Sequence, residues 1–326
     1  CARAFTKSLV TQGKRIVPSK IAAEKKAVVS ARGVEWYDAD PRGLDGVGGN
    51  DLLKVWLKQR KHAFSERARA FGLPPPKGVI IVGPPGTGKS LTAKCVASAW
   101  GLPLLRFDGG AQKGGIVGES ERNVRAAYAT AEAVGSCVLW FDEIEKMFGG
   151  AAGALDGGVS ADALAVFLTF MQEKKGNVFV VATANNVSAL PPEMLRKGRF
   201  DEMWFVDLPT QREREEILRV SMVKVSRDPA TVDLSEIARA CVEFTGAEIA
   251  SIVTDALFAA FEDGERAITT GDLLKGAATV VPQAKSAAEK IKSLREWAKG
   301  RARRTSVEEE VQPSTAGAKD LDLDTN

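Results

Sequence analysis

Hydrophobic residues in the first two thirds of the chain gather in short runs, which helical stretches separate. Four of these runs occupy residues 79–82, 104–107, 137–141 and 178–182. Strands that are apolar at nearly every position are typical of a parallel sheet with helices on both faces, because such strands are buried on both sides. The pattern therefore predicts an α/β domain with a parallel sheet at residues 34–209.

The pattern changes after residue 209, where the strand signal ends and apolar residues recur with the period of an amphipathic helix. Helices are expected at residues 211–223, 234–243, 247–263 and 270–278. With no strand between them, these helices must bury their apolar faces against one another. A smaller all-helical domain is therefore predicted at residues 210–283.

Both ends of the chain differ in composition from these domains. Residues 1–33 form a basic lead-in with one helical run at residues 21–31. Residues 284–326 are assigned to a basic helix, expected to be solvated and amphipathic, and to an acidic tail that is expected to be disordered. Because the chain begins with Cys1 rather than methionine, a trimmed chain is expected.

The composition is that of a globular protein and excludes several classes. Hydrophobic residues make up 44% of the 326 residues, yet no apolar stretch approaches the roughly 20 residues that span a bilayer, so no membrane anchor is expected. The single histidine, His62, lies in a charged stretch, which argues against an HExxH zinc peptidase and a Ser-His-Asp hydrolase. Four scattered cysteines favour a reducing cytosol, and the net charge of +3 is too small to indicate nucleic-acid binding.

A phosphate-binding motif follows the first apolar run. Residues 83–90 read Gly-Pro-Pro-Gly-Thr-Gly-Lys-Ser, a complete GxxxxGK(S/T) motif, and a helix is expected at residues 90–100. Glycines allow the backbone to point its N–H groups at phosphate oxygens, and the helix N-terminus adds partial positive charge. Lys89 is expected to reach the β- and γ-phosphates, and Ser90 to ligate Mg²⁺. The motif therefore predicts ATP and Mg²⁺ as cofactors.

Two carboxylates follow the third apolar run. Asp142 and Glu143 stand at the carboxyl end of the strand predicted at residues 137–141. In a P-loop enzyme, the first carboxylate of such a pair holds Mg²⁺ and the second acts as general base on the attacking water. Ser90 and Asp142 are therefore the predicted metal ligands, and Glu143 is the predicted base.

From residue 46 to residue 280, these and further motifs occur in an order that closely resembles the classical AAA family of ATPases. The resemblance implies a P-loop α/β domain followed by a helical lid, ATP hydrolysis with Mg²⁺, and assembly into a homo-oligomeric ring, a hexamer. Residues 180–185 are similar to the strand that carries the family's polar sensor, which implies that Asn185 orients the lytic water.

Residues 195–201 resemble the family's second region of homology. The resemblance implies that Arg196 and Arg199 act as arginine fingers, which reach the γ-phosphate held by the next subunit. FtsH-type proteases share this pattern, but the single histidine excludes their zinc peptidase domain from this chain.

Two glycine-containing segments resemble the family's other contacts with the nucleotide. Residues 46–49 are similar to the segment that contacts adenine, and residues 244–248 to the start of the lid helix that closes over the nucleotide. With the phosphate motif, the resemblance implies nucleotide binding by Val47, Gly48, Pro85, Gly86, Thr87, Gly88, Lys89, Ser90, Leu91, Gly246 and Ala247.

Within the family, residues 51–60, 137–140 and 184–202 are similar to AAA proteins of cyanobacteria and plastids that are named as a hypothetical chloroplast reading frame. This likeness implies a bacterial cytosol or a plastid stroma as the compartment. It does not identify a substrate.

The family's substrate-threading loop corresponds to residues 114–121, where Ile116 replaces the usual aromatic residue. An aliphatic side chain between glycines offers less contact area and a more flexible backbone for gripping a polypeptide. A ring that remodels a protein client, gripped by Ile116, is the leading hypothesis. The alternatives are a nucleotide-gated assembly factor or switch that threads nothing, and a nucleic-acid motor that uses the basic residues 285–304, which no aromatic platform accompanies.

Overall fold

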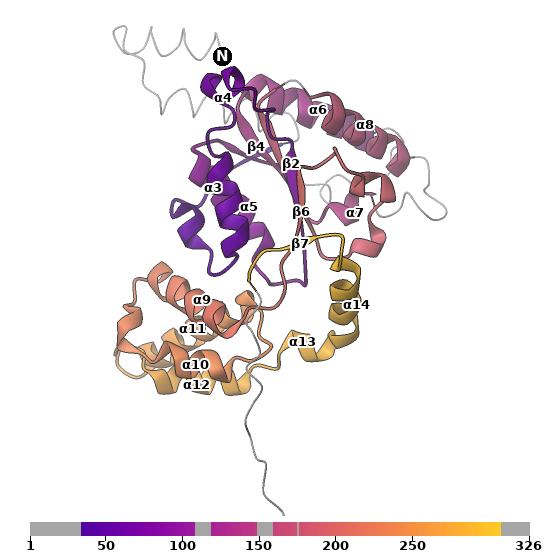
Figure 1. Ribbon diagram of the computed structural model, residues 1–326. Coiled ribbons are helices and arrows are strands. Elements are labelled where there is room, and N and C mark those ends of the chain that lie inside the picture. The colour runs from indigo at the N-terminus through magenta and orange to yellow at the C-terminus, as the bar shows by residue number, and fades with distance from the viewer. Residues whose placement is uncertain (1–33, 108–118, 149–158, 175, 308–326) are drawn as a thin grey trace, which may run out of the picture.

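The computed structural model describes residues 34–107, 119–148, 159–174 and 176–307. The helix expected at residues 21–31 and the predicted client-gripping residue Ile116 lie outside these ranges. Figure 1 shows a sheet with helices on both sides and, below it, a separate group of helices. The predicted α/β fold with a following helical lid is confirmed.

The sheet contains seven strands within the described residues, in the order β1-β3-β4-β5-β2-β6-β7. Their bounds are β1 (Glu35–Tyr37), β2 (Gly78–Val82), β3 (Leu104–Phe107), β4 (Cys137–Phe141), β5 (Val178–Ala184), β6 (Glu202–Phe205) and β7 (Arg303–Arg304). All neighbouring strands are parallel except β1, which runs antiparallel to β3. The four predicted strands are β2 to β5, and every residue of β2, β4 and β5 is buried, as an unbroken apolar run requires.

Helices cover both faces of this sheet. On one face lie α3 (Asp51–Arg60) and α5 (Lys89–Trp100), and on the other lie α6 (Glu119–Val134), α7 (Ile144–Phe148) and α8 (Val159–Glu173). The connections include α4 (Glu66–Ala70), η1 (Gly43–Gly46), η2 (Val187–Ala189) and η3 (Pro192–Leu195). Because β4, β5 and β2 are neighbours, the segments that follow Phe141, Ala184 and Val82 meet at one edge of the sheet. This edge is where ligands bind in open α/β sheets.

The lid consists of α9 (Gln211–Lys224), η4 (Pro229–Thr231), α10 (Leu234–Ala240), α11 (Gly246–Glu262) and α12 (Thr270–Thr279). Its own core includes the buried residues Leu218, Ile237, Ile249, Ile252 and Leu273. Three of its helices, α9, α11 and α12, begin with a capping box, in which a threonine and a carboxylate three residues later satisfy each other's backbone N–H.

After the lid, the chain returns to the α/β domain through α13 (Gln283–Ser286) and α14 (Ala288–Ala298). One face of α14 buries Leu294 and Ala298 in the core beside the sheet, and Arg295 forms an ion pair with Asp207 at 2.9 Å. The next residues form β7, which lies parallel to the edge strand β6. The sequence predicted no strand after residue 209, because two arginines carry no apolar signal and β7 depends on backbone pairing with β6. Within the described residues, no helix is both long and apolar enough to cross a membrane.

Candidate nucleotide-binding site

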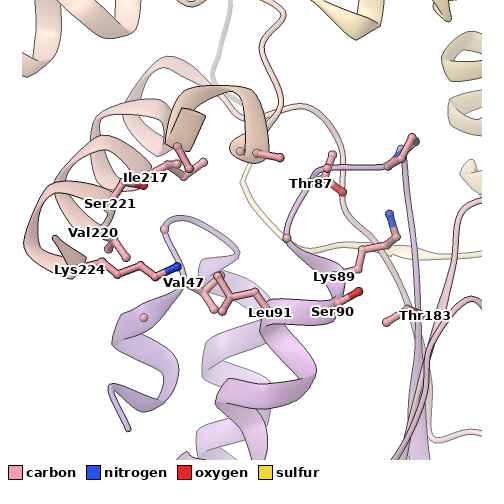
Figure 2. Close-up of a pocket in the computed structure, with 18 of the residues that line it drawn as sticks. Val47, Thr87, Lys89, Ser90, Leu91, Thr183, Ile217, Val220, Ser221 and Lys224 are labelled. Carbon is pink, nitrogen blue, oxygen red and sulfur yellow. The ribbon is translucent and has the colours of Figure 1, made fainter. Parts of the chain in front are cut away.

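A cavity of about 640 Å³ lies between the carboxyl edge of the sheet and the lid. Figure 2 shows Lys89, Ser90 and Thr183 on one side and Ile217, Val220 and Lys224 of α9 on the other. All the predicted nucleotide-binding residues line this cavity: Val47, Gly48, Pro85, Gly86, Thr87, Gly88, Lys89, Ser90, Leu91, Gly246 and Ala247. The predicted metal and catalytic residues Asp142, Glu143 and Asn185 also line it. The structure thus brings fourteen predicted positions, from motifs far apart in the sequence, to one site.

The phosphate loop connects β2 to α5 and owes its shape to two glycines. Gly86 has φ +79° and Gly88 has φ +88°, in the left-handed region that side chains with a Cβ rarely adopt. The hydroxyl of Thr87 donates a hydrogen bond of 2.8 Å to the carbonyl of Pro84, which holds the loop closed on itself. Helix α5 begins directly after Gly88, so the N–H groups of its first turn, which have no partner within the helix, lie next to the loop.

Lys89 is held inside this loop. Its Nζ donates to the carbonyl oxygens of Gly83 at 2.9 Å and Pro84 at 2.6 Å, and the residue is 5% exposed. Burial lowers the pKa of Lys89 to about 8, against the opposing effect of the nearby carboxylates, of which Glu145 has the largest effect. A buried ammonium group that only two carbonyls satisfy is well suited to an anionic ligand such as a phosphate.

Ser90 and Asp142 lie close enough to share a metal ion. The hydroxyl of Ser90 donates to Oδ1 of Asp142 at 2.8 Å, across the gap between α5 and the end of β4. A hydroxyl and a carboxylate beside a phosphate-binding loop are the oxygen ligands that Mg²⁺ uses in nucleotide enzymes. The donor set therefore fits Mg²⁺ bound together with a nucleotide.

Glu143 occupies a constrained position at the cavity. Its backbone has φ +50°, which is uncommon for a residue with a side chain. Asn185 donates from Nδ2 to Oε1 of Glu143 at 2.8 Å, and Lys146 forms an ion pair with Oε2 at 2.5 Å. The amide of Asn185 thus fixes the orientation of the carboxylate that is predicted to act as base.

Two residues at this edge of the sheet were not predicted from the sequence. Thr183, which is 1% exposed, donates from Oγ1 to Oδ1 of Asp142 at 2.7 Å and accepts a hydrogen bond from the backbone N–H of Glu143 at 3.1 Å. Glu145, which is 8% exposed, accepts one from the backbone N–H of Asn185 at 2.8 Å. For Thr183, the signal in the sequence was a hydroxyl residue inside an otherwise apolar strand, because a buried polar group needs a hydrogen-bond partner.

The opposite end of the cavity is largely apolar. Val47 and Gly48 face Ile217 and Val220 of α9, and a Cβ on Gly48 would lie 2.7 Å from Ile217. This close approach explains why a glycine stands between the α/β domain and the lid. The apolar walls suit a flat aromatic base, while Lys224 extends from α9 toward Val47 in Figure 2.

Arg196 and Arg199 do not line this cavity. Both follow η3, and Arg196 is exposed, with no hydrogen bond or ion pair of its side chain among the described residues. Arg199 is half-buried, and its Nη1 donates to the carbonyl of Leu168 in α8 at 2.6 Å. Any contact between these arginines and a nucleotide therefore requires a nucleotide outside the cavity of the same chain.

Comparison with known proteins agrees with this geometry. The family described as "ATPase family associated with various cellular activities (AAA)" matches residues 79–208, and the "AAA+ lid domain" matches residues 231–275. The "Uncharacterized AAA domain-containing protein ycf46" of Pyropia yezoensis is 43% identical over 295 residues, which cover 90% of this chain and 60% of the relative. The "Proteasome-activating nucleotidase" of Aeropyrum pernix is 36% identical over 214 residues, which cover 64% of this chain and 51% of the relative.

Among solved structures, the FIGL-1 AAA domain superposes with a TM-score of 0.67 at 21% identity, over 89% of this chain and 99% of that one, and shows a shared fold. The chain spans between half and three fifths of the length of the two curated relatives described above. The matches to the ATPase domain and to its lid lie on the two domains that enclose the cavity. The chain belongs to the AAA family.

Proposed function

We propose that this protein binds ATP with Mg²⁺ and hydrolyses it to ADP and phosphate. The observation that carries the proposal is the convergence of the buried Lys89, the Ser90–Asp142 pair and the Glu143–Asn185 pair on one cavity. These groups match, in kind and order, the phosphate, metal and water-activating parts of a P-loop enzyme.

Each group has a role that follows from its chemistry. Lys89 exchanges its two carbonyl partners for phosphate oxygens, and the backbone N–H groups of the glycine loop donate to the same phosphates. Ser90 and Asp142 hold Mg²⁺, which supplies positive charge against the charge that develops on the phosphoryl group. Glu143 accepts the proton of the attacking water, and Asn185 keeps its carboxylate in the productive orientation.

The proposed assembly is a homo-oligomeric ring, a hexamer, in which Arg196 and Arg199 act on the nucleotide of the next copy. Support comes from their position outside the cavity of their own chain and from the exposure of Arg196. A guanidinium that enters a neighbouring site supplies charge to the transition state only when the ring forms.

The proposed client is a protein, since one relative carries a name that describes activation of the proteasome. The grip of Ile116 on such a client stays a prediction, as does a bacterial cytosol or plastid stroma as the compartment. Stimulation of ATP turnover by an unfolded protein supports remodelling. A turnover rate that no protein changes favours a nucleotide-gated switch.

The purified chain tests the central proposal directly. We expect phosphate release from ATP in the presence of Mg²⁺ and its loss when EDTA removes the metal. The ring is measured by sedimentation of the Glu143→Gln variant with and without ATP. Absence of Mg²⁺-dependent phosphate release at every protein concentration contradicts the hydrolysis proposal.

A further inference from the structure

We infer that Thr183 is a positioning residue, whose single hydroxyl sets both the metal-binding carboxylate Asp142 and the backbone of the base Glu143. The inference rests on the proposed ATPase function. The hydroxyl of Thr183 donates a hydrogen bond of 2.7 Å to Asp142 and accepts one of 3.1 Å from the backbone N–H of Glu143. With 1% of the residue exposed, water does not compete for either bond.

The sheet register places this hydroxyl where both partners are within reach. Phe141, the last residue of β4, pairs with Ala182 of β5, so Thr183 lies beside the first residue after β4. The chain leaves the sheet at that point, and α7 begins at Ile144. The turn between β4 and α7 is therefore hydrogen-bonded to the side chain of Thr183 in the neighbouring strand β5.

The turn needs this support because Glu143 adopts φ +50°. Such backbone geometry is unfavourable for a residue with a Cβ and persists where surrounding contacts fix it. Glu143 has one N–H, and its acceptor is the Thr183 hydroxyl. Removing the hydroxyl leaves that N–H without its acceptor and frees the turn that carries the base.

Asp142 depends on Thr183 for a second reason. Within the described residues, the donors to its carboxylate are the hydroxyls of Ser90 and Thr183, both to Oδ1. Because the proposed function assigns Ser90 to Mg²⁺, Thr183 is the protein donor that Asp142 keeps when the metal is bound. Partners of this kind orient a metal ligand, and their removal typically costs about 10- to 100-fold in metal affinity or activity.

The test compares Thr183→Val, which has no hydroxyl, with Thr183→Ser, which keeps it. Thr130→Val is the matched control, because Thr130 is 2% exposed and donates to Ala126 at 2.7 Å within α6, away from the cavity. Thr183→Ala removes the same hydroxyl without adding a methyl group, and serves if the valine variant is insoluble.

Three measurements are made on each variant. In the nucleotide-free protein, the exchange rate of the Glu143 amide is read by NMR, and we expect it to rise at least about tenfold in Thr183→Val and to stay within about twofold in Thr183→Ser. With Mg²⁺ and ATP, we expect kcat of Thr183→Val to fall by about 10- to 100-fold and the Mg²⁺ concentration for half-maximal rate to rise. The Kd of a non-hydrolysable ATP analogue, measured without Mg²⁺, stays within about threefold, because the phosphate loop is untouched.

Wild-type turnover in Thr183→Val, failure of Thr183→Ser to restore turnover, or an equal loss in Thr130→Val overturns the inference. So does an unchanged exchange rate at Glu143. A wild-type chain that releases no phosphate contradicts the proposed function instead, and the exchange rates then still report whether Thr183 holds the turn.

Discussion

The backbone N–H of Ala247 donates a hydrogen bond of 3.0 Å to the carbonyl oxygen of Gly86. This bond joins the first turn of lid helix α11 to the phosphate loop. The N-cap residue Thr245 also touches the loop, since a Cβ on Gly86 would lie 2.9 Å from its hydroxyl oxygen. The lid and the phosphate loop are therefore in direct contact.

Replacing Ala247 with proline tests this connection. Ala247 is the second residue of α11, where proline is compatible with the helix, so the change removes one N–H and places a ring carbon against the carbonyl of Gly86. We expect the affinity for ADP to fall by about two- to tenfold, the value of one hydrogen bond. Fluorescence titration with a labelled nucleotide measures it.

The control for this variant is Gly271→Pro. Gly271 is the second residue of α12, and its N–H donates no hydrogen bond among the described residues. We expect unchanged ADP affinity in this variant. Equal losses in the two variants would assign the effect to the helices themselves rather than to the bond between lid and loop.

Nucleotide affinity should depend on pH through Lys89. Its pKa is lowered to about 8 by burial, so above that pH the free protein increasingly holds a neutral amine. Bound phosphates favour the ammonium form, and binding then requires proton uptake. The affinity should fall by up to about tenfold per pH unit above pH 8, while the nucleotide itself, with a phosphate pKa near 6, does not titrate.

The measurement is ADP binding by calorimetry in two buffers of different ionisation enthalpy, which counts the protons taken up. We expect uptake to approach one proton at about pH 9 and to vanish near pH 7. Lys89→Ala should lose detectable binding throughout, because the phosphates lose their buried counter-charge. A flat affinity from pH 7 to pH 9.5 would mean that Lys89 stays charged without a ligand.

How far the site could be predicted depends on the distance in the chain between partners. The phosphate loop is specified within eight residues, since its glycines at 86 and 88 and the following lysine determine the local backbone and charge. The buried strands β2, β4 and β5 were visible as apolar runs, and β3 as a similar run that contains one charged residue, Arg106. In contrast, β6 (Glu202–Phe205) was not predicted, because two of its four residues are only half-buried and its sequence shows no such run.

Thr183 and Glu145 escaped prediction for a different reason. Their partners lie about 40 residues away in the chain and become neighbours only through the pairing of β4 with β5. No spacing rule within one segment encodes such a contact. The role of Arg196 and Arg199, after η3, came from the resemblance. A single chain does not test that role, because the partner of these arginines would lie on another copy of the chain.

Glu143→Gln should separate binding from turnover. The glutamine side chain can keep the hydrogen bond from Asn185 through its Oε1, so the site stays organised, but it cannot accept the proton of water. We expect ATP to stay bound and kcat to fall by about 10²- to 10⁴-fold. Rapid-quench measurement of phosphate release reads the loss.

Glu173→Gln is the control, since Glu173 is exposed at the end of α8 and does not line the cavity. It should turn over ATP at the wild-type rate. Undiminished hydrolysis in Glu143→Gln would remove Glu143 from the role of base and leave it as a partner of Asn185 and Lys146.

Arg196→Ala and Arg199→Ala should leave ATP binding nearly intact and lower hydrolysis by about a thousandfold or more, the effect of losing an arginine finger. The two variants should differ in stability. Arg199 donates to the carbonyl of Leu168, so its removal should lower the free energy of unfolding by about 1–2 kcal/mol, whereas Arg196 has no such bond. Lys197→Ala, an exposed change between them, is the control for both measurements.

Mixing experiments then decide whether the fingers act between copies. A variant that lacks Arg196 or Arg199 keeps its own cavity intact, and the Glu143→Gln variant keeps its arginines intact. A mixed ring therefore contains interfaces at which an intact cavity of one variant faces the intact arginines of the other. Such mixtures should regain part of the hydrolysis that each variant lacks, and wild-type activity per copy should rise with protein concentration until rings form. Arg196 lies outside the cavity of its own chain and has no partner among the described residues. In a fully active dilute monomer, this side chain would therefore not contact the nucleotide. If the wild type behaves in that way and the mixtures stay inactive, Arg196 and Arg199 are structural residues and hydrolysis is completed within one chain.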